Sequence, residues 1–218
     1  MPHAIQAGQS ACLLVFAKAP EPGLAKTRLI PLLGAEGAAR LQARLTRRAI
    51  NTALDANSGQ VELWCFPHAG HPFFSALGAE LGVALNSQCG GDLGDKMCQA
   101  AAQALASNRP ALIFGTDCPL LTPGHIEQAL AALSQGQDAV LIPAEDGGYV
   151  LLGLARMAPE LFRGIDWGTD RVLAQTRERL YGLGFRFAEL EPLPDLDRPE
   201  DVLKLSLEHP QLWHHLTS

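Results

Sequence analysis

The 218-residue sequence is poor in lysine, in aromatic residues and in long apolar runs. Four of its 17 basic residues are lysines, and the net charge is −6. An acidic chain has no general electrostatic attraction for nucleic acid or for an anionic membrane, which excludes the broad class of polyanion-binding proteins. The apolar run Ala11–Ala17 is too short for a signal-peptide core with its cleavage site or for a bilayer-crossing helix, so we expect neither.

Cysteine pairs and several familiar motifs are also missing. The five cysteines form no CxxC pair, and Cys12 and Cys65 lie inside apolar runs. We therefore expect free thiols in a reducing, cytoplasmic setting, and no zinc site. The sequence contains no GxxxxGK[ST], no GxGxxG and no GxSxG. These absences exclude a Walker A loop and a hydrolase nucleophile elbow, and they argue against a dinucleotide-binding fingerprint.

Short apolar runs alternate with helical patterns along the whole chain, with no repeat and no linker, so we expect residues 1–218 to form one domain. Predicted strands are Ala11–Ala17, Val61–Phe66, Val83–Leu85, Ala111–Gly115, Asp138–Pro143, Tyr149–Leu154 and Phe185–Leu190. Predicted helices are Ala35–Ala56, Pro72–Leu81, Asp95–Ala106, one opening at Thr122-Pro123, Thr169–Tyr181 and Pro199–Leu207, with a further turn or two over His209–Leu216.

This alternation predicts an α/β fold with a parallel sheet and helices on both of its faces, and periodicity alone does not choose among the doubly wound folds. The fifth and sixth predicted strands are joined by only a few residues, across Asp146-Gly147-Gly148. A hairpin-like connection of that length requires an antiparallel pair, so we expect a mixed sheet with one reversed strand.

A loop with two cations and a glycine follows the first predicted strand. Gly23 lets the backbone approach a ligand closely, Lys26 and Arg28 bring positive charge, and Thr27 adds a hydroxyl. Lys18 stands at the start of the same loop. Ligands of open α/β sheets bind beyond the carboxyl ends of the strands, so we interpret this loop as a phosphate-binding site. The alternative is an ordinary solvated basic loop.

Carboxylates are placed where they could hold a metal ion. Asp117 directly follows a buried strand, and Asp195 and Asp197 alternate in a later segment, so that both side chains can face the same way. Carboxylate oxygens suit Mg²⁺ beside a polyphosphate. The alternatives are structural: Asp117 can cap a turn, and Asp197 with Glu200 can cap the following helix.

Two glycine-containing loops complete the candidate site. Asp146-Gly147-Gly148 either forms a hairpin turn or allows an acceptor to approach the backbone. The segment from Gln88 through Asp92 to Lys96 precedes a helix N-terminus, which favours anions, and we interpret it as a substrate-covering loop. Asp92 and Asp95 can equally be helix caps. Of the four lysines, Lys18 and Lys26 flank the proposed phosphate loop and Lys96 ends the covering loop, so we expect positive charge to be concentrated at one crevice.

The motifs occur together, in this order: Phe16-Ala-Lys-Ala-Pro-Glu-Pro-Gly-Leu-Ala-Lys-Thr-Arg-Leu29, Gly90-Gly-Asp-Leu-Gly94, Gly115-Thr-Asp-Cys-Pro119, Asp146-Gly-Gly-Tyr149, Trp167-Gly-Thr169 and Asp195-Leu-Asp-Arg-Pro-Glu-Asp201. As a set they resemble a bacterial family assigned as glycosyltransferases within the nucleotide-diphospho-sugar transferase (GT-A) superfamily. More distantly they resemble the guanylyltransferases that make molybdenum cofactor and 2-phospholactate-guanosine diphosphate. A DxD triplet typical of metal-dependent members is replaced by Thr116-Asp117-Cys118, with one carboxylate.

The resemblance implies a three-layer α/β/α fold of the Rossmann-like GT-A type, with a mostly parallel sheet. It also implies a transferase that uses Mg²⁺ or Mn²⁺ and a nucleotide-activated donor, either an NTP or an NDP-sugar, with a small-molecule acceptor. Carried over by position, Lys26, Arg28 and Asp117 would be catalytic, and Asp117 with Asp195 or Asp197 would hold the metal. Gly147 and Gly148 would line the acceptor side. The alternative is a nucleotide-binding or sensing module without catalysis. The oligomeric state, the base, the sugar and the acceptor stay open.

Overall fold

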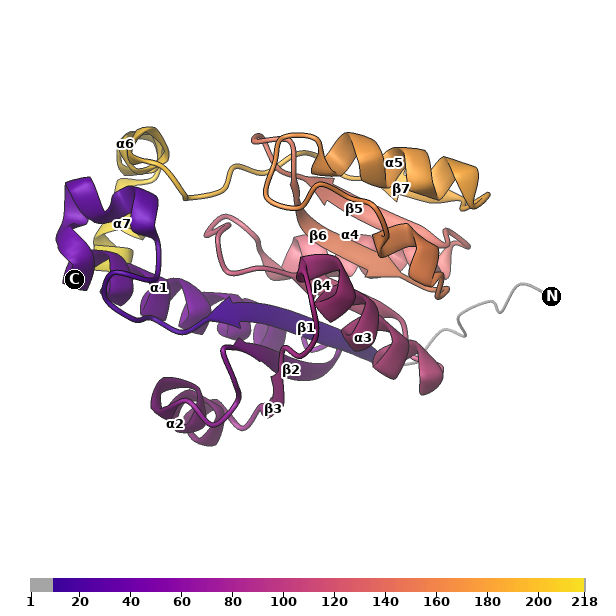
Figure 1. The fold of residues 1–218 in the computed structure, drawn as a ribbon, viewed down its shortest axis with the longest axis horizontal. Helices are drawn as coiled ribbons and strands as arrows, with labels where there is room; N and C mark the ends of the chain where they lie inside the picture. The colour runs from indigo at the N-terminus through magenta and orange to yellow at the C-terminus, as the bar shows by residue number, and fades with distance from the viewer. Residues whose placement is uncertain (1–9, 218) are drawn as a thin grey trace.

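A seven-stranded sheet forms the centre of the molecule (Figure 1), in a computed structural model that describes residues 10–217. The strand order is β3-β2-β1-β4-β6-β5-β7, and only β6 runs antiparallel to its neighbours β4 and β5. The predicted single reversed strand is thus confirmed. The strands are β1 (Ala11–Lys18), β2 (Gly59–Phe66), β3 (Ala84–Ser87), β4 (Ala111–Phe114), β5 (Ala139–Pro143), β6 (Tyr149–Leu154) and β7 (Phe187–Glu189).

Helices cover both faces of the sheet, because the central strands are apolar on both sides. Helices α1 (Ile30–Asp55), α2 (Pro72–Leu81) and α4 (Pro123–Ser134) share one buried cluster with the sheet. Helices α3 (Leu93–Ala106) and α5 (Val172–Gly182), with the short helix η2 (Pro159–Phe162), share the other. The predicted three-layer α/β/α architecture is therefore confirmed.

A third apolar cluster lies outside these layers. Helices α6 (Pro199–Glu208) and α7 (Pro210–Thr217) pack against α1 and the short helix η1 (Thr27–Leu29). Figure 1 shows α6 and α7 together at one end of the molecule, beside the start of α1. The shared core consists of Leu29, Leu41, Leu45, Leu196, Val202, Leu205 and Leu216. This packing brings the segment around Leu196 back to the loop that follows β1.

Three helices begin two or more residues away from their predicted starts. Helix α1 begins at Ile30 instead of Ala35, because Gly34 (φ 70°, ψ 165°) joins two helical pieces across a kink. Helix α3 begins at Leu93, since Asp92 is its N-cap and accepts a hydrogen bond from the Asp95 N–H at 2.9 Å. Helix α5 begins at Val172, three residues later than predicted.

One of the two alternatives for Asp197, a cap of helix α6 made together with Glu200, is contradicted by the structure. Neither Asp197 nor Glu200 caps this helix. Instead the Asp201 carboxylate reaches back and accepts from the Arg198 N–H at 2.7 Å and the Asp197 N–H at 2.9 Å. The Asp197 carboxylate is thereby left to face the sheet edge. Within the described part of the chain, no helix is both long enough and apolar enough to span a bilayer.

Candidate active site

A cleft of about 730 Å³ opens at the edge of the sheet where β1, β2 and β4 end. The β5–β6 turn and the loop before α5 form the opposite wall. Ligand sites in proteins typically measure about 300–1,000 Å³, and open α/β sheets place them at this edge. A second cavity, between α6 and the loop after β4, measures only about 20 Å³, the size for a single water molecule. The large cleft is therefore the candidate ligand site.

Lys26 lies at the floor of the cleft in an unusual backbone conformation. Its φ of 47° is left-handed, and its side chain is only 2% exposed. The ammonium Nζ lies 2.8 Å from Asp117 Oδ1 and 3.9 Å from Asp197 Oδ1, and donates to the Leu196 carbonyl at 2.5 Å. A buried charge needs partners of this kind, because an unpaired one costs several kcal/mol. Lys26 thus connects the ends of β1 and β4 to the segment before α6.

The other residues of the predicted phosphate loop divide into two groups. Arg28 is 58% exposed, hydrogen-bonds to Asp197 and lines the cleft, as does Thr27. Lys18 also lines the cleft, and its Nζ donates to the Leu24 carbonyl at 2.7 Å, which closes the loop on itself. Gly23 (φ 82°) is not part of the lining; its backbone makes the turn that the loop requires.

Asp117 is held in place from several directions. Its backbone carbonyl accepts from the Leu196 N–H at 2.7 Å, and its Oδ1 accepts from the Thr116 hydroxyl at 3.3 Å as well as from Lys26. Thr116 is itself buried against Gln42 of α1, whose amide donates to the Thr116 hydroxyl at 3.0 Å. The Asp117 side chain stays 51% exposed toward the cleft, so a ligand can still reach it.

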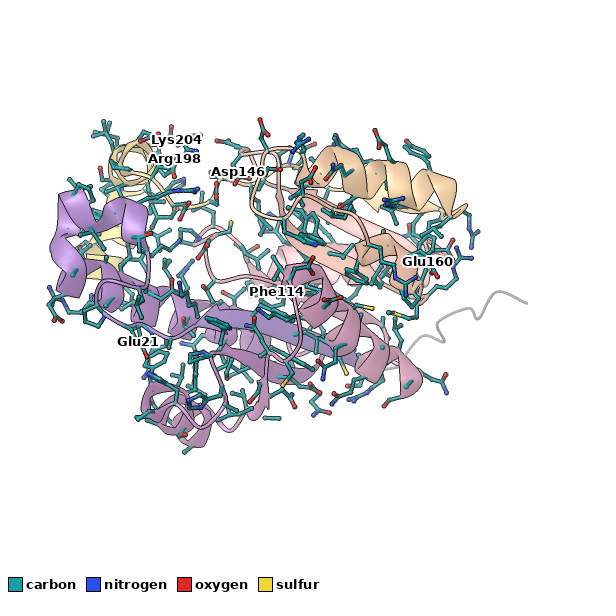
Figure 2. The ribbon with its side chains drawn as sticks, viewed as in Figure 1. Glu21, Phe114, Asp146, Glu160, Arg198 and Lys204 are labelled. Carbon is teal, nitrogen blue, oxygen red and sulfur yellow. The ribbon has the colours of Figure 1, made fainter. Side chains whose placement is uncertain are left out.

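Asp195 is partly buried in the cleft, in a position that disfavours the charged form of its carboxylate. Burial raises its pKa to about 6, with the nearby carboxylates of Asp146, Asp201 and Asp117 adding to the shift. Figure 2 shows Asp146 on the β5–β6 turn and Lys204 on α6. Glu145, next to Asp146 in the chain, pairs with Lys204 at 2.8 Å. This ion pair joins the turn to α6 itself, and the carboxylates of Asp146 and Asp195 place negative charge between the turn and the segment before α6.

A divalent cation fits the chemistry of this donor set. Oxygen ligands suit Mg²⁺ and Mn²⁺, and Mg²⁺ is commonly held by one or two carboxylates together with phosphate oxygens and water. Among residues 10–217, no group of three or more His, Cys, Asp and Glu side chains converges in the manner of an all-protein metal cage. Asp197 is engaged by Lys26 and Arg28, whereas Asp195 is crowded by like charge. A cation between Asp117 and Asp195 would relieve that crowding.

The glycine-containing turn and the predicted covering loop are only partly in the cleft. Gly148 and Asp146 line it, whereas Gly147 does not. Gly147 (φ 90°) is approached by the chain's own backbone, since an added Cβ would lie 2.2 Å from the Asp170 carbonyl. Gln88 and Lys96 line the cleft, but Asp92 does not, because it caps α3.

Sequence reasoning missed the apolar half of the cleft. Phe16, Phe66 and Leu93 line it, and Phe66 is 39% exposed with the Lys96 ammonium 4.7 Å from its ring centroid. The position of Phe66 at the carboxyl end of a strand was a usable signal. Gln42 was also missed: it and Thr46 are polar residues four apart on the buried face of α1, where leucines and alanines were expected.

Comparison with known proteins agrees with this fold. A protein from Desulfovibrio desulfuricans G20, provisionally assigned as a nucleotide-diphospho-sugar transferase, is 28% identical, with a TM-score of 0.81 over 94% of this chain and 97% of that one. The 4-diphosphocytidyl-2C-methyl-D-erythritol synthase of Anaerococcus prevotii DSM 20548 is 11% identical, with a TM-score of 0.64 over 94% and 98% of the two chains.

A third similar structure was solved with a metal ion and a nucleotide bound to that protein. The glucosyl-3-phosphoglycerate synthase of Mycobacterium tuberculosis, in complex with Mn²⁺, UDP and glucosyl-3-phosphoglycerate, is 12% identical, with a TM-score of 0.53 over 98% of this chain and 82% of that one. Together with the Anaerococcus synthase, it establishes a fold shared with nucleotidyl and glycosyl transferases. No curated protein matches the chain. Residues 49–169 match a family described as "Uncharacterized protein conserved in bacteria (DUF2064)", and the chain belongs to that family.

Proposed function

We propose that this chain is a divalent-metal-dependent transferase that uses a nucleotide-activated donor. The observation that carries the proposal is the group at the cleft floor: the buried Lys26 ammonium set between the carboxylates of Asp117 and Asp197, with Arg28 beside them. Cations and carboxylates alternate there, which suits a metal-bound diphosphate. The proposal takes residues 1–218 as one domain, and places it in the cytoplasm because all five cysteines are free thiols.

In this proposal the two ends of the cleft bind the two ends of a nucleotide. Lys26 and Arg28 donate to phosphate oxygens, and Asp117 with Asp195 holds Mg²⁺ or Mn²⁺, which neutralises charge on the transferring or leaving phosphate. Phe16 and Phe66 supply an apolar surface for the base. Asp146 and Gly148, on the opposite wall, face the acceptor. Most of the catalysis is positioning and charge stabilisation by fixed groups.

Two reactions fit these roles. In nucleotidyl transfer, an acceptor phosphate oxygen bonds to the α-phosphorus of an NTP, and the bond to pyrophosphate breaks. In glycosyl transfer, an acceptor oxygen bonds to the anomeric carbon of an NDP-sugar, and the bond to the nucleoside diphosphate breaks. Three cations in one loop favour the first, because a leaving pyrophosphate carries high charge. The likeness to the Desulfovibrio protein favours the second.

The first experiment is a thermal-shift screen. ATP, CTP, GTP, UTP, UDP-glucose and GDP-mannose are tested with and without MgCl₂. A ligand at about 100 times its Kd stabilises by about 2.7 kcal/mol, which raises the Tm of a chain this size by about 5–10 °C. Asp117→Asn removes the metal-dependent part of the shift, whereas Asp55→Asn, an exposed residue outside the cleft, leaves it unchanged.

Measurements of turnover then distinguish nucleotidyl transfer, glycosyl transfer and nucleotide binding without catalysis. Pyrophosphate release from the stabilising NTP with phosphorylated acceptors supports nucleotidyl transfer, and nucleoside diphosphate release from an NDP-sugar supports glycosyl transfer. Binding without turnover, unaffected by Asp117→Asn, supports the non-catalytic sensing module instead. If no nucleotide or NDP-sugar shifts the Tm at millimolar concentration with Mg²⁺, the proposed function is wrong.

A further inference from the structure

A chain of buried polar groups runs from the middle of α1 to Asp117. Thr46 is fully buried, Gln42 is 4% exposed and Thr116 is 5% exposed. The Gln42 amide nitrogen lies 3.3 Å from Thr46 Oγ1 and 3.0 Å from Thr116 Oγ1, and Thr116 Oγ1 lies 3.3 Å from Asp117 Oδ1. The rest of this helix face packs through leucine and alanine. Burying polar groups there costs free energy unless they hydrogen-bond to one another or to a ligand.

The direction of these hydrogen bonds follows from the number of protons available. The Thr46 hydroxyl donates its one proton to the Gln42 backbone carbonyl at 2.9 Å, so it can only accept from the Gln42 side chain. Gln42 must therefore turn its NH₂ group toward Thr46, and the second N–H of that group is directed to Thr116. The Thr116 hydroxyl then accepts from Gln42 and has its own proton left for Asp117.

As a consequence, the Thr116 hydroxyl always presents its proton, and not a lone pair, to the Asp117 carboxylate. Its Oδ1 accepts from Thr116 and from Lys26, which fixes the carboxylate plane and leaves Oδ2 for a ligand from the cleft. The same loop is held on its other side by Arg48 of α1, whose Nε donates to the Pro119 carbonyl at 2.7 Å. Helix α1 thus supports the Asp117 loop with both a neutral amide and a cation.

We propose that Gln42 is a positioning residue: through the Thr116 hydroxyl it orients the Asp117 carboxylate for a divalent cation. The inference rests on the proposed function, because it assumes that Asp117 is a metal ligand. Hydrogen-bond partners of metal ligands typically change metal affinity by about 10–100-fold when they are removed. Gln42→Met keeps the length of the side chain and removes its donors. Thr116→Val keeps the shape and removes the hydroxyl.

The test measures Mn²⁺ binding by equilibrium dialysis, with Mn²⁺ alone and with an equimolar mixture of ADP, CDP, GDP and UDP. The expected result is that Asp117→Asn removes binding, and that Gln42→Met and Thr116→Val each weaken it about tenfold or more. Thr116→Ser retains the hydroxyl and restores binding to within about twofold of the wild type, a rescue that a purely structural role would not predict. Thr52→Val, a buried threonine of α1 outside the cleft lining, is the matched control and leaves binding unchanged.

The possible outcomes distinguish the inference from the function on which it rests. If the wild type binds no Mn²⁺ under either condition, the proposed function fails. If the wild type binds Mn²⁺ and Asp117→Asn abolishes it, while Gln42→Met and Thr116→Val bind as tightly as the wild type, the function stands and the inference is overturned. Should Gln42→Met fail to fold, the comparison of Thr116→Val with Thr116→Ser decides the question alone.

Discussion

Asp195 is a residue whose ionisation is opposed by its surroundings. Burial, together with the charges of Asp146, Asp201 and Asp117, raises its pKa from the ordinary 3.8 to about 6. The folded protein therefore holds the Asp195 proton more tightly than the unfolded chain does. Stability from this group is highest below pH 4 and is lost as the pH rises through about 4 to 6, where the folded state must give up the proton.

We predict that Asp195→Asn stabilises the protein in a pH-dependent way. Two pKa units correspond to about 3 kcal/mol at most, so the gain in free energy of unfolding is near zero at pH 4 and rises to about 1–3 kcal/mol at pH 7. Urea unfolding at pH 4, 5, 6 and 7 measures this. Asp55→Asn, on the exposed end of α1, serves as the control substitution. An equal change at pH 4 and pH 7 would contradict the prediction.

At the scale of structural elements, the β5–β6 turn is fitted against the loop before α5. Gly147 has φ 90°, its carbonyl accepts from the Leu173 N–H at 2.8 Å, and an added Cβ would lie 2.2 Å from the Asp170 carbonyl. Gly168, in the loop on the other side of this contact, has a similar φ of 80° but nothing within 4 Å of an added Cβ. Comparing a substitution at Gly168 with one at Gly147 therefore separates two contributions to unfolding free energy: the unfavourable backbone conformation, which both share, and the steric clash with Asp170, which only Gly147 has.

We predict that Gly168→Ala costs about 1–2 kcal/mol of unfolding free energy, the price of a left-handed conformation for a residue with a Cβ. Gly147→Ala costs about 1–3 kcal/mol more, because the backbone of Asp170 must also move. Urea denaturation of the two variants measures the difference. Equal losses of unfolding free energy in the two variants would contradict the prediction, because they would mean that the turn moves away from Asp170 at no cost.

The elements also show where prediction from sequence succeeds and where it stops. The apolar runs of β1 and β4 predicted the central strands, since periodicity and burial are local properties. A cap of α6 made by Asp197 and Glu200 was one of two alternatives that the sequence left open. The cap is made by Asp201, because nearby carboxylates compete for the same N–H groups and tertiary contacts decide between them. Asp197 is drawn away by Lys26 and Arg28, which are about 170 residues distant in sequence.

The candidate site was predictable to a similar degree. Strand-end positions identified Lys26, Arg28 and Asp117 as members of one crevice, because topology alone brings the carboxyl ends of strands together. The same reasoning could not place Gly147 against Asp170 or assign Gln42 to Asp117. Those contacts depend on side-chain packing between elements that are distant in sequence.

On the scale of the whole molecule, the rate at which the buried cysteines are alkylated can measure how often the folded protein unfolds. Cys89 is exposed, whereas burial raises the pKa of Cys12, of Cys65 to about 12 and of Cys118 to about 11, so these three stay protonated at neutral pH. Because the thiolate is the reactive form, alkylation needs both access and deprotonation.

We predict that iodoacetamide at pH 7.5 modifies Cys89 first in the native protein and all five cysteines in urea. Intact-mass spectrometry follows the reaction. Cys89→Ser removes the rapid phase and leaves the slow modification that tracks unfolding. Rapid labelling of Cys12 or Cys65 in native buffer would mean that the sheet opens locally.

The contact between Lys26 and Leu196 also sets an order of events during synthesis. The two residues are 170 positions apart, so at about 5–20 residues per second the ribosome takes roughly 10–30 s to supply the second after the first. During that interval a nascent chain can pair β1 with β2 and β4, but its Lys26 lacks the Leu196 carbonyl and the Asp197 carboxylate. A product that stops short of Leu196 would therefore contain most of the sheet and no complete site. The cleft becomes competent only when translation has passed the residues that lead into α6.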